Sequence, residues 1–297
     1  MNLIPDLHPP SSRRRGIMLC QAFDEKRLIK WNTQAVLAQP KLDGERCRAL
    51  ITPQGVQLLS SEVNEIISVP HISEQLQWLC QHWELPSLEL DGELYATGMD
   101  FSEIHSRVSR KENIHDNYAD IKFHVFDIIE HGPQTERIGH LISLFNKYVA
   151  PDIQLVNSKV IDPTVDAIME SLNVFTAEGN EGIIVRHPFA YYERKRSLYV
   201  MKWKPKKNDI YRILACQQEY SQDGKPKDSL GAFICCGEDG TPFGVGTGFT
   251  ASQRKDYWQR RHQMPGMYVE VAYQSLTSKR IPRFPVFCNL VESPFND

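Results

Sequence analysis

Residues 41–46 combine the side chains that nucleophilic chemistry at a lysine requires. Lys41 follows the short apolar run 35–38, Asp43 comes two positions later, and Gly44 and Arg46 complete the segment. In an extended chain Lys41 and Asp43 point to the same side, and Gly44 lets the chain bend toward a second strand. A free lysine has a pKa of about 10.4 and attacks poorly near neutral pH. Chemistry at Lys41 therefore requires neighbouring cations, a metal ion or desolvation to release its proton.

Taken alone, this segment also fits an exposed turn with a solvated lysine and aspartate. Charged or aromatic residues recur, however, in four predicted strands further along the chain, at residues 90–95, 123–129, 181–186 and 199–205. These strands contain, in order, Asp-Gly-Glu, Phe-Asp, Glu-Gly and Lys-x-Lys. Side chains alternate along a strand, so Lys202 and Lys204 share one face. Five such elements, spaced so that they fill one domain, favour a catalytic site over a surface turn.

The ordered set Lys-x-Asp-Gly-x-Arg, Asp-Gly-Glu, Phe-Asp, Glu-Gly and Lys-x-Lys resembles the covalent nucleotidyltransferase superfamily. Within it, the chain looks most like the short, two-domain, ATP-dependent DNA ligases of bacteriophages and bacteria, over about residues 35–287. The resemblance implies an enzyme of DNA replication, repair or recombination that seals nicks in duplex DNA. AMP joins a lysine, passes to the DNA 5′-phosphate, and leaves when the 3′-hydroxyl attacks. It further implies ATP and Mg²⁺ (or Mn²⁺) as cofactors, nicked double-stranded DNA as partner, and a monomer.

The resemblance assigns the nucleotide contacts. Lys41 matches the nucleophile that forms a phosphoramidate with AMP. Gln39 occupies the place where the family reads the adenine amino group, and a carboxamide oxygen accepts such a hydrogen bond. Phe126 matches the aromatic ring that stacks on the base, and His124 lies on the same strand face. Arg46 matches the arginine that contacts the nucleotide and later the DNA end.

The resemblance also assigns the groups that handle charge. Glu93 matches a ribose-binding or metal-binding carboxylate, and Glu181 matches the metal carboxylate. Lys202 and Lys204 match the pair that holds the α-phosphate, while Arg186 stands where the family carries a lysine beside the phosphate. With Mg²⁺, the charges of the lysine pair would also favour a neutral nucleophile, because nearby like charges depress the pKa of a lysine.

Two positions depart from the family pattern. The ligases usually carry an arginine after a serine in the third strand, where this chain has Ser61. Arg107 and Arg110 are the candidates to supply that phosphate or DNA contact. The final basic motif of the chain, residues 279–285, contains no acidic residue. Arg283 is the best match to the arginine of the family motif. Arg283 is therefore expected to orient the departing pyrophosphate during attack on ATP.

The predicted elements indicate an α+β protein with two domains. Strands are predicted at residues 35–41, 47–51, 56–60, 88–95 and 121–129, and helices at 23–30, 71–83, 138–148 and 165–177. Short strands follow at 211–216, 232–236, 241–247, 267–273 and 284–290, with one helix at 251–262, a pattern typical of a small oligonucleotide-binding (OB) barrel. Residues 1–206 are thus expected to form an ATP-grasp-like, antiparallel-sheet nucleotidyltransferase domain with a loose N-terminal tail. Residues 207–297 are expected to form an OB-fold DNA-binding domain.

Composition sets further limits. The net charge is −3, but between residues 190 and 215 eight basic residues stand against two acidic ones, a stripe that can neutralise phosphates. Seven cysteines are scattered, with no Cys-x-x-Cys spacing, which argues against a zinc knuckle and for a reducing compartment. No apolar run approaches the roughly 20 residues of a membrane helix, and no secretory signal is visible. We therefore expect a cytoplasmic protein with no membrane association.

Three other functions compete with nick sealing. An mRNA-capping guanylyltransferase shares the lysine motif but uses GTP, and Gln39 together with the Gly-rich turn at residues 244–250 favours the ligase. An RNA ligase usually lacks the C-terminal barrel. A single-strand-binding protein built on that barrel offers no reason for Lys41, Glu93 and Glu181 to occur together.

Overall fold

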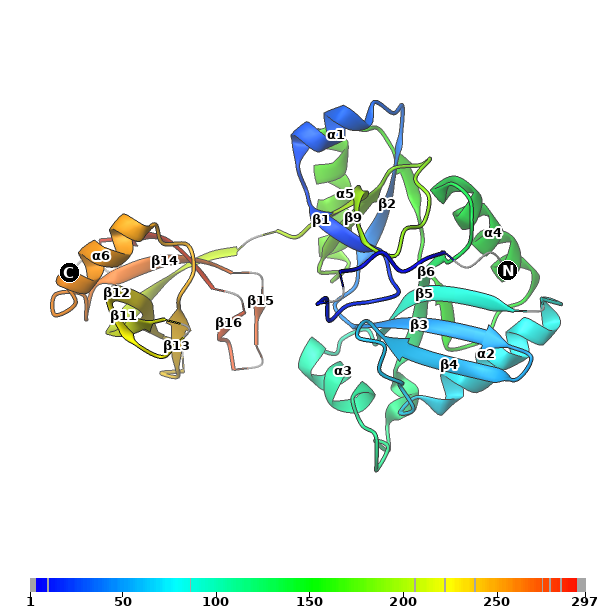
Figure 1. Ribbon diagram of the computed structural model, residues 1–297, viewed down its shortest axis with the longest axis horizontal. Helices are drawn as coiled ribbons and strands as arrows, with labels where there is room; N and C mark the ends of the chain where they lie inside the picture. The colour runs from blue at the N-terminus through cyan, green and yellow to red at the C-terminus, as the bar shows by residue number, and fades with distance from the viewer. Residues whose placement is uncertain are drawn as a thin grey trace. The chain divides into compact units, whose positions relative to one another are not determined.

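The computed structural model describes residues 4–9, 11–85, 87–205, 207–221, 223–237, 239–273, 275–277, 279–283 and 285–292, with the side chains of residues 275 and 283 left out. The chain divides into two compact units, Met1–Lys204 and Pro205–Asp297 (Figure 1). Within the described residues, no helix is both long and apolar enough to cross a membrane.

One sheet of the first unit carries the strand that ends at Lys41. Its strands, in spatial order, are β1 (Leu19–Ala22), β10 (Arg196–Trp203), β9 (Gly182–Arg186), β2 (Val36–Lys41) and β8 (Lys159–Ile161). The β1–β10 pair is parallel and the other three pairs are antiparallel. Helices α1 (Glu25–Trp31) and α5 (Val165–Ala177) pack against this sheet through buried apolar residues such as Trp31, Leu172 and Phe175. Helix α5 has the predicted bounds.

The second sheet of this unit contributes Arg46, Glu93 and Phe126. Its strands, in spatial order, are β4 (Gly55–Ser60), β3 (Glu45–Thr52), β5 (Leu88–Tyr95), β6 (Lys122–Ile128) and β7 (Ile153–Leu155). The helices around it are α2 (Pro70–His82), α3 (Phe101–Val108) and α4 (Gln134–Lys147), and the 3-10 turn η1 (Tyr118–Asp120) precedes β6. Ile72, Leu76 and Leu79 of α2 are fully buried, as their helical spacing predicts.

Two motif glycines stand where strands approach too closely for a side chain. A Cβ at Gly44, where the chain passes from β2 to β3, would lie 2.2 Å from the carbonyl oxygen of Leu94. A Cβ at Gly182, the first residue of β9, would lie 2.2 Å from the carbonyl oxygen of Trp203. These glycines therefore let β3 meet β5 and β9 meet β10 at hydrogen-bonding distance.

The second unit is a five-stranded sheet with one helix. Its strands, in spatial order, are β13 (Pro242–Val245), β12 (Pro226–Cys236), β11 (Lys207–Tyr220), β14 (Tyr268–Tyr273) and β17 (Val286–Val291). The two edges approach at a parallel bridge between Thr247 and Val286, supported by a 2.8 Å hydrogen bond from the Phe287 amide to the Thr247 carbonyl. Helix α6 (Ala251–Gln259) packs on β12, and β15 (Ser275–Leu276) pairs with β16 (Pro282–Arg283). Stacked rings of Phe249 and Phe287, with centroids 4.3 Å apart, lie in the core.

The α+β class is confirmed, and several local expectations are corrected. Helix α3 lies in a stretch with no predicted element, although Asp100 and Glu103 form a capping box that marks its start. Strand β11 is much longer than predicted because residues before and after 211–216 continue to pair with β14 and β12. The N-terminal segment differs most from expectation: Ile4, Leu7, Arg15 and Gly16 are hydrogen-bonded to the body of the first unit, so the described part of the segment is not a loose tail.

Candidate active site

Most of the predicted site residues line one cavity in the first unit, with a volume of about 280 Å³. They come from β2, β3, β5, β6, β9 and β10 and its end, so both sheets contribute. The predicted residues in its lining are Gln39, Lys41, Arg46, Glu93, Phe126, Arg186, Lys202 and Lys204. Further lining residues that the sequence interpretation did not assign to the site include Arg14, Phe101 and Arg196.

A single carboxylate joins the two lysines at the end of the first sheet. Oε2 of Glu181 forms an ion pair with Nζ of Lys41, and Oε1 of Glu181 accepts a hydrogen bond from Nζ of Lys204. Lys41 also donates to the carbonyl oxygen of Leu42 over 3.2 Å. The pairing of β2 with β9 brings this about, because Lys41 is the register partner of Gly182, next to Glu181.

The carboxylates around Lys41 favour its charged form in the structure without metal or nucleotide. Burial lowers the pKa of Lys41, but the carboxylates of Glu181 and Glu93 outweigh burial, so its pKa is raised. The pKa values of Lys202 and Lys204 are lowered by burial and by the positive charge of Lys41. Glu181 thus stabilises the ammonium form of Lys41, and attack by Nζ requires that negative charge to be offset first.

The carboxylates beside Lys41 suit a divalent cation. Burial raises the pKa of Glu93 to about 7, against the lowering effect of Lys41 and Arg46. Mg²⁺ typically binds one or two carboxylates and completes its shell with water and substrate phosphates. Within the described residues no cluster of three or more His, Cys, Asp or Glu side chains forms a cage made of protein ligands alone. Glu93 and Glu181 thus fit a metal that arrives with a phosphate-bearing substrate.

An aromatic ring and two guanidinium groups form another part of the site. Cζ of Arg46 lies 4.6 Å from the centroid of the Phe126 ring, and Cζ of Arg186 lies 5.4 Å from it. Phe126 is half-buried and lines the cavity. His124 lies instead beside the ring of Tyr95 and is not among the lining residues.

Gln39 and Arg186 belong to a buried polar network. The Gln39 amide donates to the Phe126 carbonyl oxygen and to Oγ of Ser158, and its oxygen accepts from Nε of Arg186 over 2.7 Å. Nη1 of Arg186 donates to Asp127, 3.0 Å away. Gln39 is 1% exposed and Arg186 is 5% exposed. In this structure the oxygen expected to read adenine is therefore occupied by Arg186.

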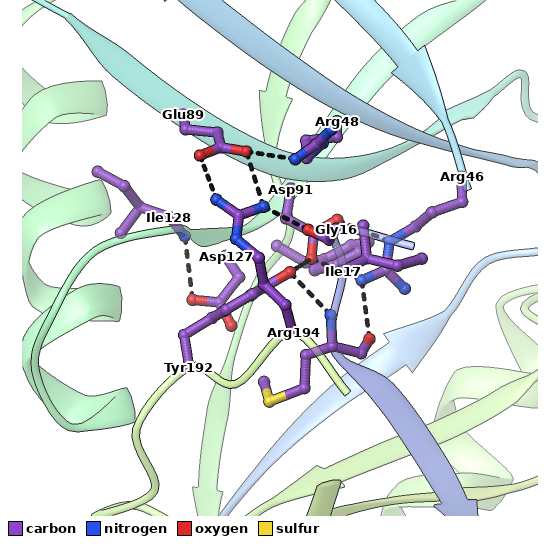
Figure 2. Close-up of polar contacts among 12 residues, drawn as sticks. Gly16, Ile17, Arg46, Arg48, Glu89, Asp91, Asp127, Ile128, Tyr192 and Arg194 are labelled. Atoms are coloured by element: carbon purple, nitrogen blue, oxygen red, sulfur yellow. Dashed lines mark hydrogen bonds and ion pairs between the residues drawn. The ribbon is translucent and has the colours of Figure 1, made fainter. Parts of the chain in front are cut away.

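Two residues that the sequence interpretation did not assign to the site hold Arg46 in place (Figure 2). Nε and Nη2 of Arg46 donate to the two oxygens of Asp91 over 2.6 and 2.5 Å. Asp91 also accepts a 2.6 Å hydrogen bond from the hydroxyl of Tyr192, and that hydroxyl accepts one from the Met18 amide. Such bidentate contacts restrict the guanidinium to one orientation at the cavity wall.

The structure does not bring two of the predicted cations, Arg107 and Arg110, to the cavity. Arg107 pairs with Asp120, and Arg110 donates to the carbonyl oxygens of Ser106 and Asn113, so neither lines the cavity. Arg283 lies in β16 of the second unit, and its side chain is outside the described part of the chain. Ser61, where the expected arginine is missing, does line the cavity.

The profiles of two protein families match different parts of the chain. The profile of the ATP dependent DNA ligase domain matches residues 17–204. The profile of the DNA ligase OB-like domain matches residues 223–290. A DNA ligase of Haemophilus influenzae is 25% identical over 205 residues, which are 69% of this chain and 72% of that protein.

Solved structures share the fold of the whole chain. One, from work on DNA binding by the minimal Lig E DNA ligases, has a TM-score of 0.71 and 23% identity, covering 93% of this chain and 99% of that one. The ATP-dependent DNA ligase of bacteriophage T7 in complex with ATP has a TM-score of 0.55 and 17% identity, covering 93% and 98%. These similarities confirm the predicted nucleotidyltransferase fold followed by an OB fold.

Proposed function

Because the chain belongs to the family of ATP-dependent DNA ligases, we propose that it seals nicks in duplex DNA through a covalent AMP adduct on Lys41. The observation that carries this proposal is the convergence of Lys41, Glu93 and Lys204, from two sheets, at one cavity, with Glu181 paired to both lysines. A stable surface network does not require a half-buried lysine to share a carboxylate with a second lysine. A site that receives a triphosphate does require such an arrangement. The carboxylate holds the two lysines in place until a phosphate group replaces it.

In the first step Nζ of Lys41 attacks the α-phosphorus of ATP. An N–P bond forms, the bond to the bridging oxygen breaks, pyrophosphate leaves, and the lysine proton passes to solvent. Lys202 and Lys204 neutralise the developing charge on the phosphate oxygens. When bound to Glu93 and Glu181, Mg²⁺ would cancel the negative charge that keeps Lys41 protonated and would polarise the phosphate.

The same residues serve the later steps in this proposal. Arg46, fixed by Asp91, contacts the nucleotide and then the DNA end. Phe126 stacks on the adenine ring. Gln39 either positions Arg186, to which it is hydrogen-bonded, or rotates to bind the base itself. Arg283 is proposed to act on the departing pyrophosphate. We place the reaction in the cytoplasm, where ATP and DNA occur together, and propose that one chain acts on each nick.

Sealing assays distinguish this function from its relatives. The purified protein, supplied with ATP and Mg²⁺, is expected to join a nicked DNA duplex that carries a 5′-phosphate and to leave a 5′-hydroxyl nick unsealed. GTP should not replace ATP, and an all-RNA nick should be joined much more slowly. Product strands are measured on denaturing gels. Labelling by GTP alone would indicate a guanylyltransferase, and preferred joining of RNA would indicate an RNA ligase.

A further inference from the structure

The N-terminal segment before β1 is attached to the first unit by a buried arginine (Figure 2). Arg194 is 5% exposed and donates through Nη1 and Nη2 to the carboxylate of Glu89, over 3.0 and 2.5 Å. The same guanidinium donates to the carbonyl oxygens of Ile4, over 2.9 Å, and Gly16. The Leu7 amide in turn donates to the carbonyl oxygen of Arg194. Arg194 thus holds both ends of the segment, at Ile4 and Gly16, and links them to Glu89 of β5.

A second set of contacts fixes the part of this segment nearest the cavity. The Arg15 amide donates to the carbonyl oxygen of Ser61 over 2.9 Å, and Nε of Arg15 donates to Asp6 over 3.3 Å. Arg14 therefore lies beside position 61, and both Arg14 and Ser61 line the cavity. Arg14 is close enough to Lys202 for its charge to lower the pKa of that lysine, after the larger effect of burial.

Arg14 differs from the other arginines of the site in having no side-chain partner among the residues that the structure describes. Its side chain is exposed and makes no hydrogen bond or ion pair within the described part of the chain. Arg46 and Arg186, by comparison, are held by carboxylates. A guanidinium that lines a cavity and has no counter-ion there can bind an anionic ligand.

We propose that Arg14 binds a phosphate group next to the one held by Lys202, and so supplies the cation that position 61 lacks. The inference rests on the proposed function, since the phosphate comes from ATP or from the 5′ end of the nick. It replaces the earlier candidates Arg107 and Arg110, which are engaged elsewhere. A residue far from the motif in sequence thereby takes the place of a motif arginine.

Steady-state and binding measurements on Arg14→Ala test the proposal and identify the source of the phosphate. We expect about a tenfold or larger rise either in the KM for ATP during adenylation or in the Kd for a 5′-phosphorylated nick, because a charge-assisted contact is lost. If the phosphate is that of DNA, the slope of log K against log salt should also fall by about 0.9. A 5′-hydroxyl nick should then be bound equally by the variant and the wild type.

Three further variants separate phosphate binding from a structural role. Arg14→Lys should recover part of the loss, and Arg14→Ala combined with Ser61→Arg should recover more, since position 61 lines the same cavity. Arg13→Ala, which removes the neighbouring exposed charge outside the cavity lining, should behave as wild type. The proposal is overturned if Arg14→Ala changes neither constant, or if its loss follows a lower Tm and neither rescue works. Wild-type protein that fails to seal nicks would instead contradict the proposed function itself.

Discussion

Lys41→Ala and Lys41→Arg are expected to form no covalent adduct with AMP. Alanine removes the nucleophile. Arginine keeps a cation beside Glu181 but stays protonated, so it has no lone pair with which to attack phosphorus. Incubation with α-labelled ATP, followed by a denaturing gel, measures the adduct directly. Labelling of either variant at the wild-type level would show that another residue is the nucleophile.

Two controls make this result specific to the chemical step. Lys147→Arg changes an exposed lysine at the end of α4 and should label normally. The Lys41 variants should also retain part of their activity on DNA supplied already adenylated at its 5′ end, because that substrate bypasses formation of the adduct. Complete loss on both substrates, with an unchanged Tm, would indicate that Lys41 also has an essential role in binding the nick.

Glu181→Gln is expected to lower the rate of adenylation by roughly two orders of magnitude, a loss comparable with removal of one preorganised electrostatic contact at a transition state. Glu181 pairs with Lys41 and Lys204 and is one of the two proposed metal ligands. Glutamine has nearly the same shape as glutamate but no charge, so the substitution removes both functions. Sealing of pre-adenylated DNA should fall as well, since phosphate charge must be balanced in that step. Initial rates over a range of Mg²⁺ concentrations measure both effects.

The matched control is Glu178→Gln, an exposed acidic residue three positions earlier, at the end of α5. It should leave both rates and their Mg²⁺ dependence unchanged. Glu181→Gln with near-normal sealing at limiting Mg²⁺ would show that Glu181 only holds the two lysines in place. A large fall in Tm without a change in Mg²⁺ dependence would lead to the same conclusion.

The part of the site that the sequence predicts is the part encoded by short local patterns. Lys41, Glu93 and Lys202 each lie in a strand with a recognisable motif, and alternation along each strand indicates which of its residues share a face. Their convergence depends on which strands pair, and the pairing of β2 with β9 joins residues about 140 positions apart. That pairing follows from the family resemblance and not from local propensity.

Contacts between charged residues that lie far apart in the sequence could not be predicted from the local sequence pattern. Asp127 is fully buried between Arg137 and Arg186, and no sequence signal states which of the arginines in the chain would reach it. Burial raises the pKa of Asp127, but the two guanidinium groups outweigh it and lower the pKa overall. The same limit explains why Arg14 is not among the candidates predicted from sequence: a basic N-terminal segment looks unstructured until its partners, Arg194 and Ser61, are known.

Intact-mass spectrometry of the wild-type protein after incubation with ATP and Mg²⁺ tests the central claim most directly. We expect the mass to rise by one AMP, no rise with GTP, and return to the unmodified mass when pyrophosphate is added, because the phosphoramidate forms reversibly. Peptide mapping should place the adduct on Lys41. A protein that seals nicks yet never carries AMP, or that carries it on a residue outside the cavity, would contradict the account.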